Sequence, residues 1–94
     1  MKEMKTKTEE IYKIYDELYR GYNSFKNEID EDRKETIMGD CHPSITLDDW
    51  AYQFYFNEDG DIFCLPNEGE AYYVASFEED RDIVVDKLID FLDN

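Results

Sequence analysis

The chain has 94 residues, of which 25 are acidic and 10 are lysine or arginine, so its formal charge at pH 7 is −15. Lysine and arginine must replace phosphate counterions when a protein binds nucleic acid, so this charge excludes a protein that binds DNA or RNA directly and unaided. Apolar residues make up 41% of the chain and aromatic residues 16%, which rules out a disordered acidic tail and predicts a single folded domain over residues 1–94.

The first third of the chain predicts a long amphipathic helix over residues 8–29. Thr6 and Glu9 match a capping box at its start. Gly21, inside this helix, costs about 1 kcal/mol relative to alanine. The apolar side chains recur at steps of three and four and form one stripe: Ile11, Ile14, Tyr15, Leu18, Tyr22, Phe25 and Ile29. A stripe this aromatic needs a sheet or a second copy of the chain to cover it, so a homodimer is one expectation.

The next stretch is highly charged and then irregular. Residues from Glu28 to Met38 either extend the first helix or form a short second helix that ends at Gly39. Pro43 restricts the backbone of His42 and interrupts regular structure. The segment from Thr46 to Asp49 is expected to be a turn or a single helical turn.

From Trp50 onward the apolar residues alternate with a period of two, which is typical of half-buried strands. Asp59-Gly60 is a strong hairpin signal, and Pro66 ends the strand that follows it. The expected strands form a three-stranded antiparallel meander over Trp50–Phe56, Asp61–Leu65 and Ala71–Phe77.

The last stretch, residues 78–94, predicts an amphipathic helix with one apolar and one acidic side. Val84, Val85 and Leu88 belong to the apolar side. Lys87 lies at the edge of the acidic side, where carboxylates recur at steps of three or four: Glu79, Asp82, Asp86, Asp90 and Asp93. Like charges at this spacing repel by a few tenths of a kcal/mol per pair. The complete expectation is an α+β fold in the order α-β-β-β-α, with both helices on one face of the sheet.

Few residues suggest metal or covalent chemistry. Cys41, His42 and Cys64 are candidate zinc ligands, but adjacent Cys41 and His42 lack the spacing of a zinc site. A Cys–His nucleophilic pair would also need an orienting group and an oxyanion pocket. The acidic run over residues 57–61 is much shorter than a twelve-residue calcium loop. We therefore expect no metal, no cofactor and no enzymatic activity.

Cysteine content and apolar runs bear on where the protein is found. Two cysteines are too few for a disulfide framework and favour a reduced, cytoplasmic protein. The first ten residues lack the apolar run of a signal peptide, and no stretch reaches 18 apolar residues. We expect no membrane partner.

The acids concentrate in residues 28–94, which hold twenty acidic residues against four basic ones. This excess is larger than solubility requires, so we expect it to attract a basic protein surface. Exposed tyrosines, of which Tyr52, Tyr55 and Tyr73 are candidates, would anchor such a contact. The expected partner-binding residues are Glu28, Asp30, Glu31, Asp32, Glu35, Asp48, Asp49, Glu58, Asp59, Asp61, Glu78, Glu79, Asp82, Asp86, Asp90 and Asp93.

In size and composition the chain resembles the small acidic DNA-mimic proteins that phages use against host restriction or CRISPR nucleases. The acids of residues 28–35 and 78–93 carry this resemblance, together with the Lys, Asn, Tyr and Ile content typical of an AT-rich genome. It implies that the protein occupies the basic DNA groove of such a nuclease, often as a homodimer, in the host cytoplasm. Two alternatives are an immunity protein or antitoxin that shields a basic toxin nuclease, and an adaptor module that uses its aromatic surface.

Overall fold

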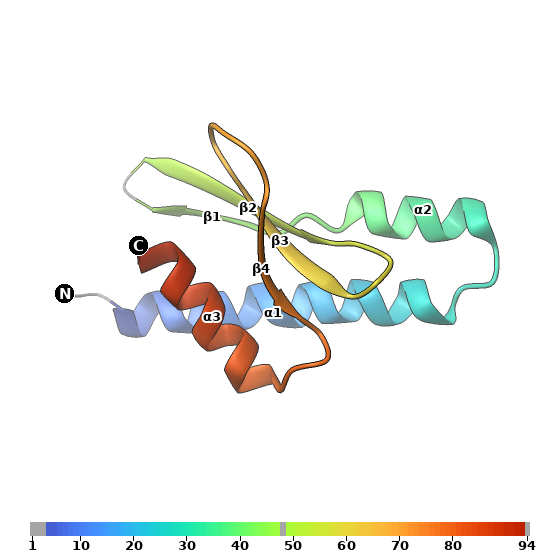
Figure 1. Ribbon diagram of the computed structural model, residues 1–94, viewed down its shortest axis with the longest axis horizontal. Coiled ribbons are helices and arrows are strands. Elements are labelled where there is room, and N and C mark those ends of the chain that lie inside the picture. Colours follow the sequence, from blue (N-terminus) through green and yellow to red (C-terminus); the bar gives the residue numbers. More distant parts are fainter. Residues whose placement is uncertain (1–3, 48, 94) are drawn as a thin grey trace.

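Three helices and a four-stranded antiparallel sheet make up the protein (Figure 1). The computed structural model describes residues 4–47 and 49–93. The strands follow one another in the sheet in chain order, β1-β2-β3-β4. The predicted α+β class is confirmed, but the sheet has four strands where the sequence predicts three. The elements are α1 (Met4–Asn27), α2 (Glu31–Asp40), β1 (Ser44–Leu47), β2 (Trp50–Phe56), β3 (Asp61–Pro66), β4 (Tyr72–Ser76) and α3 (Arg81–Asp93).

The unpredicted strand is β1, which occupies part of the segment expected to be a turn. Ser44 lies opposite Gln53 of β2, and Leu47 lies opposite Trp50. Four residues are too few to show a period of two. This segment is a strand because it pairs with β2, and its own sequence does not indicate one. The turn to β2 contains Asp49, whose φ of 70° is in the left-handed region that aspartate tolerates.

The first helix differs from the prediction at both of its ends. α1 begins at Met4, before the expected capping box, and ends at Asn27. Ile29, which the sequence places in the apolar stripe, lies beyond the helix and is 91% exposed. Of the two alternatives for the following segment, the separate helix is the one observed. Asp30 caps α2, because its carboxylate accepts a hydrogen bond from the Asp32 amide at 3.0 Å.

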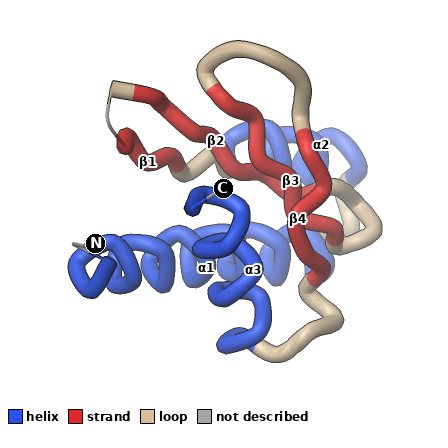
Figure 2. Tube along the Cα trace, turned by 60° about the vertical axis from the view of Figure 1, so that its left-hand side comes forward, coloured by secondary structure: helices blue, strands red, loops and turns tan. Residues whose placement is uncertain are grey.

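As predicted, α1 and α3 lie on the same side of the sheet (Figure 2). The two helices cover one face of the sheet, and the core forms between the helices and that face. α2 packs against α1 and lies beyond the sheet, so the protein is elongated, with extents of 45 × 28 × 18 Å (Figure 1). The buried core consists of Ile11, Ile14, Tyr15, Leu18, Phe25, Ile45, Phe54, Phe56, Ile62, Cys64, Ala75, Val84, Val85 and Leu88.

Tyr72 and Tyr73 are adjacent in β4 and lie on opposite faces of the sheet, as successive strand residues do, and a β-bulge sets which residues of β3 they lie opposite. Cys64 lies opposite Tyr72 and Phe63 opposite Tyr73, after a shift of register next to Ile62. The Tyr72 ring packs against Phe91 of α3, with 5.8 Å between ring centroids. Tyr73 instead packs against Phe63, at 6.1 Å. We call the side away from α1 and α3 the open face of the sheet; it carries a row of three rings, Tyr55, Phe63 and Tyr73.

Two glycines allow close approaches between elements. A Cβ atom at Gly21 of α1 would lie 2.7 Å from the sulfur of Cys41, which explains a glycine inside this helix. Gly60 is buried in the β2–β3 turn, with a φ of +84°. Its carbonyl accepts a hydrogen bond from the Phe77 amide at 2.8 Å, and a Cβ atom there would lie 2.7 Å from the Tyr22 hydroxyl. Both glycines therefore hold α1 close to neighbouring segments.

Candidate functional site

The acidic side of α3 faces solvent in the folded protein. Val84, Val85 and Leu88 are buried against the sheet and α1. The four aspartates on the other side are all exposed, and we call them the α3 acidic row: Asp82, Asp86, Asp90 and Asp93. At 1.5 Å per residue the row spans roughly 16 Å along the helix.

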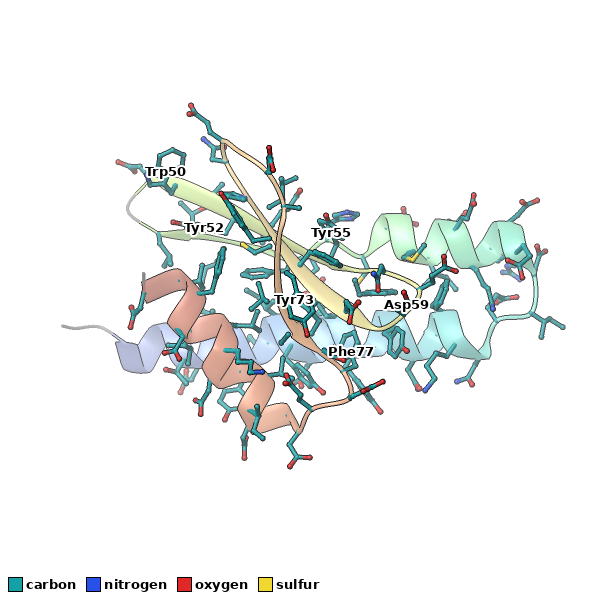
Figure 3. The ribbon with its side chains drawn as sticks, viewed as in Figure 1. Trp50, Tyr52, Tyr55, Asp59, Tyr73 and Phe77 are labelled. Carbon is teal, nitrogen blue, oxygen red and sulfur yellow. The ribbon has the colours of Figure 1, made fainter. Side chains whose placement is uncertain are left out.

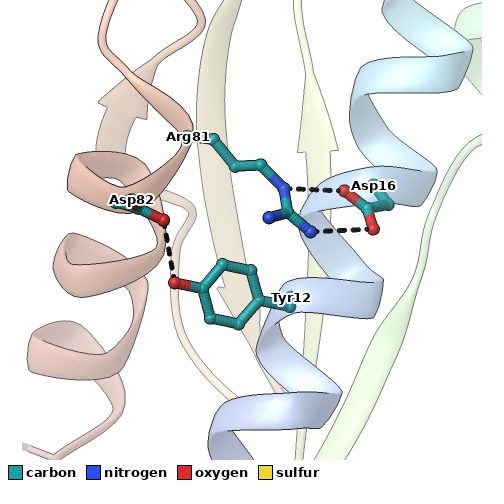
Figure 4. A network of polar contacts seen from close by, with 4 residues as sticks. All are labelled: Tyr12, Asp16, Arg81 and Asp82. Atoms are coloured by element: carbon teal, nitrogen blue, oxygen red, sulfur yellow. Dashed lines mark hydrogen bonds and ion pairs between the residues drawn. The ribbon is translucent and has the colours of Figure 1, made fainter.

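Both basic residues of α3 contact carboxylates outside this row. Arg81 makes a bidentate ion pair with Asp16 of α1, with both N–O distances at 3.1 Å (Figure 4). The Arg81 guanidinium also lies over the Tyr12 ring, 4.5 Å from its centroid. Lys87 pairs with Glu79, in the segment that precedes the helix. The ion pairs of these two cations therefore lead away from the row, to α1 and to the segment before α3.

A hydrogen bond at one end of the row connects α3 to α1. The Tyr12 hydroxyl donates to Oδ1 of Asp82 at 2.9 Å (Figure 4). This bond, with burial and the nearby Asp82 charge, raises the pKa of Tyr12, so the tyrosine stays neutral. Together with the Arg81–Asp16 pair, this contact fixes the helix that presents the row.

Glu79 is predicted to belong to the acidic row, but the structure separates it from the row. Its side chain is only partly exposed, and it accepts a hydrogen bond from the Lys87 ammonium. This bond lowers the pKa of Glu79, so the pair forms with both groups charged and their charges cancel. Glu78 and Asp80 are exposed beside it.

The acids of residues 28–35 form a second, separate group. Glu28, Asp30, Glu31, Asp32 and Glu35 lie in the α1–α2 linker and the first turns of α2. Figure 1 shows this end of α2 at one extreme of the long axis, far from α3. Arg33 and Lys34 are adjacent in α2, between Asp32 and Glu35, and reduce the net charge of this group. The structure does not join this group to the α3 acidic row.

The remaining expected acids lie in the turns of the sheet. Glu58, Asp59 and Asp61 belong to the β2–β3 hairpin, where Asn57 accepts hydrogen bonds from the amides of Asp59 and Asp61, each at 3.0 Å. Asp49 lies at the other end of β2, roughly 20 Å from the hairpin at about 3.3 Å per residue. Figure 3 shows this separation between Trp50 and Asp59. Asp48 lies outside the described residues.

The tyrosines proposed as anchors lie on different faces. Tyr55 and Tyr73 belong to the open face, and Tyr73 is 57% exposed. Tyr52 lies on the face that α1 and α3 cover, near Trp50 and Tyr72. Sequence analysis does not single out Trp50 and Tyr72 as site residues, because only the strand register and the end of α3 bring them together.

Both cysteines have free thiols; Cys41 is half-buried and Cys64 is fully buried. Among residues 4–47 and 49–93, no group of three or more Cys, His, Asp or Glu side chains has a metal-binding arrangement. Cys41 donates a weak hydrogen bond from its sulfur to the Glu17 carbonyl, and burial raises its pKa. Complete burial raises the pKa of Cys64 to about 12.

These raised pKa values predict low thiol reactivity, because the thiolate is the reactive form. With iodoacetamide at pH 8 we expect slow alkylation of Cys41, which is half-buried, and alkylation of Cys64 only after denaturation. Mass spectrometry of native and urea-treated protein, with a Cys41→Ser variant as control, measures both rates. Alkylation of Cys64 in the native protein at the rate of Cys41 would contradict its burial.

No protein-family model matches the chain, and comparisons with curated proteins and with solved structures gave no match. Across the described residues, no helix combines the length and apolar character needed to cross a membrane.

Proposed function

We propose that the protein is an acidic DNA mimic that occupies the basic DNA-binding groove of a host defence nuclease, of restriction or CRISPR type, and thereby blocks DNA binding. The observation that supports this most directly is the α3 acidic row: four exposed aspartates aligned along one side of a helix whose other side is buried. A surface that served only solubility would not need this alignment.

The spacing of the row suits a groove that binds phosphates. Aspartates four residues apart along a helix are separated by about 6 Å, the order of magnitude of charge spacing along a nucleic-acid strand. Residues outside the row contribute to the overall charge of −15. A cationic groove would feel this field over a Debye length of about 8 Å at physiological salt, so encounter would be fast and sensitive to salt.

The helix that carries the row is held rigidly. Val84, Val85 and Leu88 are at most 1% exposed, and Arg81 and Asp82 both contact α1. A mimic that is already ordered does not lose conformational entropy when it binds, which favours affinity. The proposed contact surface is therefore α3, and the acids of α2 and the turns act through the long-range field.

The test reverses charge within the row. We expect Asp86→Lys/Asp90→Lys/Asp93→Lys to weaken inhibition of a sensitive nuclease by about tenfold or more, because the row then repels the groove. Asp82 is left unchanged because it contacts Tyr12. The measurement is DNA cleavage by a panel of purified restriction and CRISPR nucleases, across a salt series and with added competitor duplex.

The matched control is Glu35→Lys/Glu58→Lys/Glu70→Lys, which changes three exposed acids outside α3. Each reversal adds two charge units, so both variants move the formal charge from −15 to −9. We expect the control to lose much less inhibition. Equal losses in both variants, or inhibition that does not depend on salt, would contradict α3 as the contact surface. Circular dichroism of both variants confirms that they fold.

One observation favours a second candidate, a non-enzymatic adaptor or assembly module. The open face exposes the row of Tyr55, Phe63 and Tyr73, and His42 extends the row with its ring 5.7 Å from that of Tyr55. Binding through these rings would persist at several hundred millimolar salt and would be lost in a Tyr73→Ala variant. An immunity protein that shields a toxin nuclease would behave like the DNA mimic but inhibit one dedicated partner.

A further inference from the structure

A pocket of about 460 Å³ lies between the end of α3 and the sheet, on the face opposite the open face. Trp50 and Tyr52 line it from β2, and Figure 3 shows both at the end of this strand that is remote from Asp59. The other lining residues are Pro66, Glu68, Tyr72 and Phe91. Four of the six lining side chains are therefore aromatic.

The strand register and the length of α3 produce this arrangement. Trp50 and Tyr52 are two residues apart in β2, so both side chains point to the same face, and Tyr52 lies opposite Pro66 of β3. α3 contributes Phe91 in its last turns and ends at Asp93. The helix does not cover the rings completely, so Trp50 stays 44% exposed and Tyr72 51% exposed. Large aromatic side chains clustered and left open in this way are typical of a contact site.

The electrostatics of the pocket favour a cation. Each aromatic ring has a negative face, and rings that surround a common space attract a positive group. Among the described residues, Glu68 is the charged residue of the lining, and the lining contains no lysine or arginine. The C-terminal end of α3 adds the negative pole of a helix dipole, with no basic residue in its last turn.

Rings elsewhere in the protein already have intramolecular cations. The Arg81 guanidinium lies over Tyr12, Lys26 over Tyr22 and Lys34 over Phe25, at 4.5, 5.4 and 5.2 Å from the ring centroids. The pocket has the same components, aromatic rings and a carboxylate, but the described residues that line it include no cation. This difference points to a cation from another molecule.

We infer that the pocket binds the cationic side chain of an arginine or lysine on a basic protein partner. The identity of that partner rests on the proposed function, since a DNA-binding groove presents many such side chains. A second copy of this chain is a poor occupant, because two molecules of charge −15 repel each other. An arginine in the pocket would act as a specific anchor beside the less specific attraction of the α3 acidic row.

Trp50 gives a direct assay, because it is the only tryptophan in the chain. The probe is acetyl-arginine amide, titrated into the intact protein at constant ionic strength while tryptophan fluorescence is recorded. Acetyl-citrulline amide has nearly the same shape without the charge. We expect a saturable fluorescence change with the arginine probe and a much weaker one with citrulline.

Tyr72 and Tyr73 provide a matched pair of variants, because they are adjacent, similarly exposed and on opposite faces. We expect Tyr72→Leu to lower the affinity for acetyl-arginine amide by about two- to fivefold, the factor expected for one exposed cation–π contact. Tyr73→Leu should leave its affinity unchanged. Glu68→Gln should also lower the affinity for acetyl-arginine amide, while the weak fluorescence change with acetyl-citrulline amide should stay the same.

Equal responses to arginine and citrulline, or equal losses in the two tyrosine variants, would overturn the inference. The result is independent of nuclease inhibition. One outcome is that acetyl-arginine amide does not bind while reversing the charges of the α3 acidic row still weakens nuclease inhibition. The pocket is then not a cation site, and the proposed function stands. If arginine binds as expected but no nuclease is inhibited, the cation pocket stands and the proposed function fails.

Discussion

Replacing Phe56 with alanine is expected to lower the free energy of unfolding by about 3–5 kcal/mol, the usual cost of truncating a buried phenylalanine. Phe56 is 2% exposed and lies where β2 meets α1 and the segment after β4. Its ring makes edge contacts with Tyr22, Phe25 and Phe77, at centroid distances of 5.5, 6.0 and 6.2 Å. The loss is a large part of the stability of a domain this size, about 5–15 kcal/mol in total.

Urea denaturation followed by circular dichroism measures this change. Phe63→Ala is the control, because Phe63 is also a strand phenylalanine but lies half-buried on the open face. We expect the free energy of unfolding of this control to fall by only about 1–2 kcal/mol, because folding buries less apolar surface at Phe63 than at Phe56. Similar losses in the two variants would show that the open face is covered in solution, for example by a second copy of the chain.

A Gly60→Ala variant is expected to lose about 2–5 kcal/mol of stability, through two effects. The φ of +84° lies in the left-handed region, which costs a residue with a Cβ atom about 1–2 kcal/mol. The new methyl group would also lie 2.7 Å from the Tyr22 hydroxyl and 3.0 Å from Cζ of the same ring, and overpacking of this kind costs about 1–3 kcal/mol. Thermal unfolding is a sufficient measurement.

Gly69→Ala separates the two effects. Gly69 also has a positive φ, +111°, but a Cβ atom there would meet no atom within 4 Å. Gly69→Ala should therefore show the cost of the backbone conformation alone. If both alanine variants lose the same stability, Tyr22 moves aside without penalty, and the close packing of the hairpin on α1 is not a source of stability.

The first and last helices and the last three strands could be predicted because their periodicity is local. Six apolar residues at helical spacing define α1, and alternation over seven residues defines β2. For the segment of α2, the sequence left two alternatives open. β1 could not be predicted, since its four residues form a strand only beside β2. Ile29 shows the opposite error: it continues the helical period but lies past the end of α1, where Asp30 starts a new helix.

Most of the acidic candidates were predictable as exposed residues, because charged side chains are seldom buried. Their grouping was not, because it depends on contacts between distant parts of the chain. Lys87 reaches back eight residues to Glu79, and Arg81 reaches Asp16 across 65 residues. The aromatic pocket has the same origin, since the ring of Phe91 meets that of Tyr72 only after α3 packs on the sheet.

The position of α2 has a consequence for how the protein opens. This helix buries none of its residues completely and packs on α1 beyond the edge of the sheet. Ile37 and Met38 are its apolar contacts with the core, so the helix can detach and melt while exposing only that part of the core, at a free-energy cost well below that of global unfolding. Proteolytic nicking should begin in the linkers on either side of it, and the fragment that remains would still hold the sheet, α3 and the aromatic pocket.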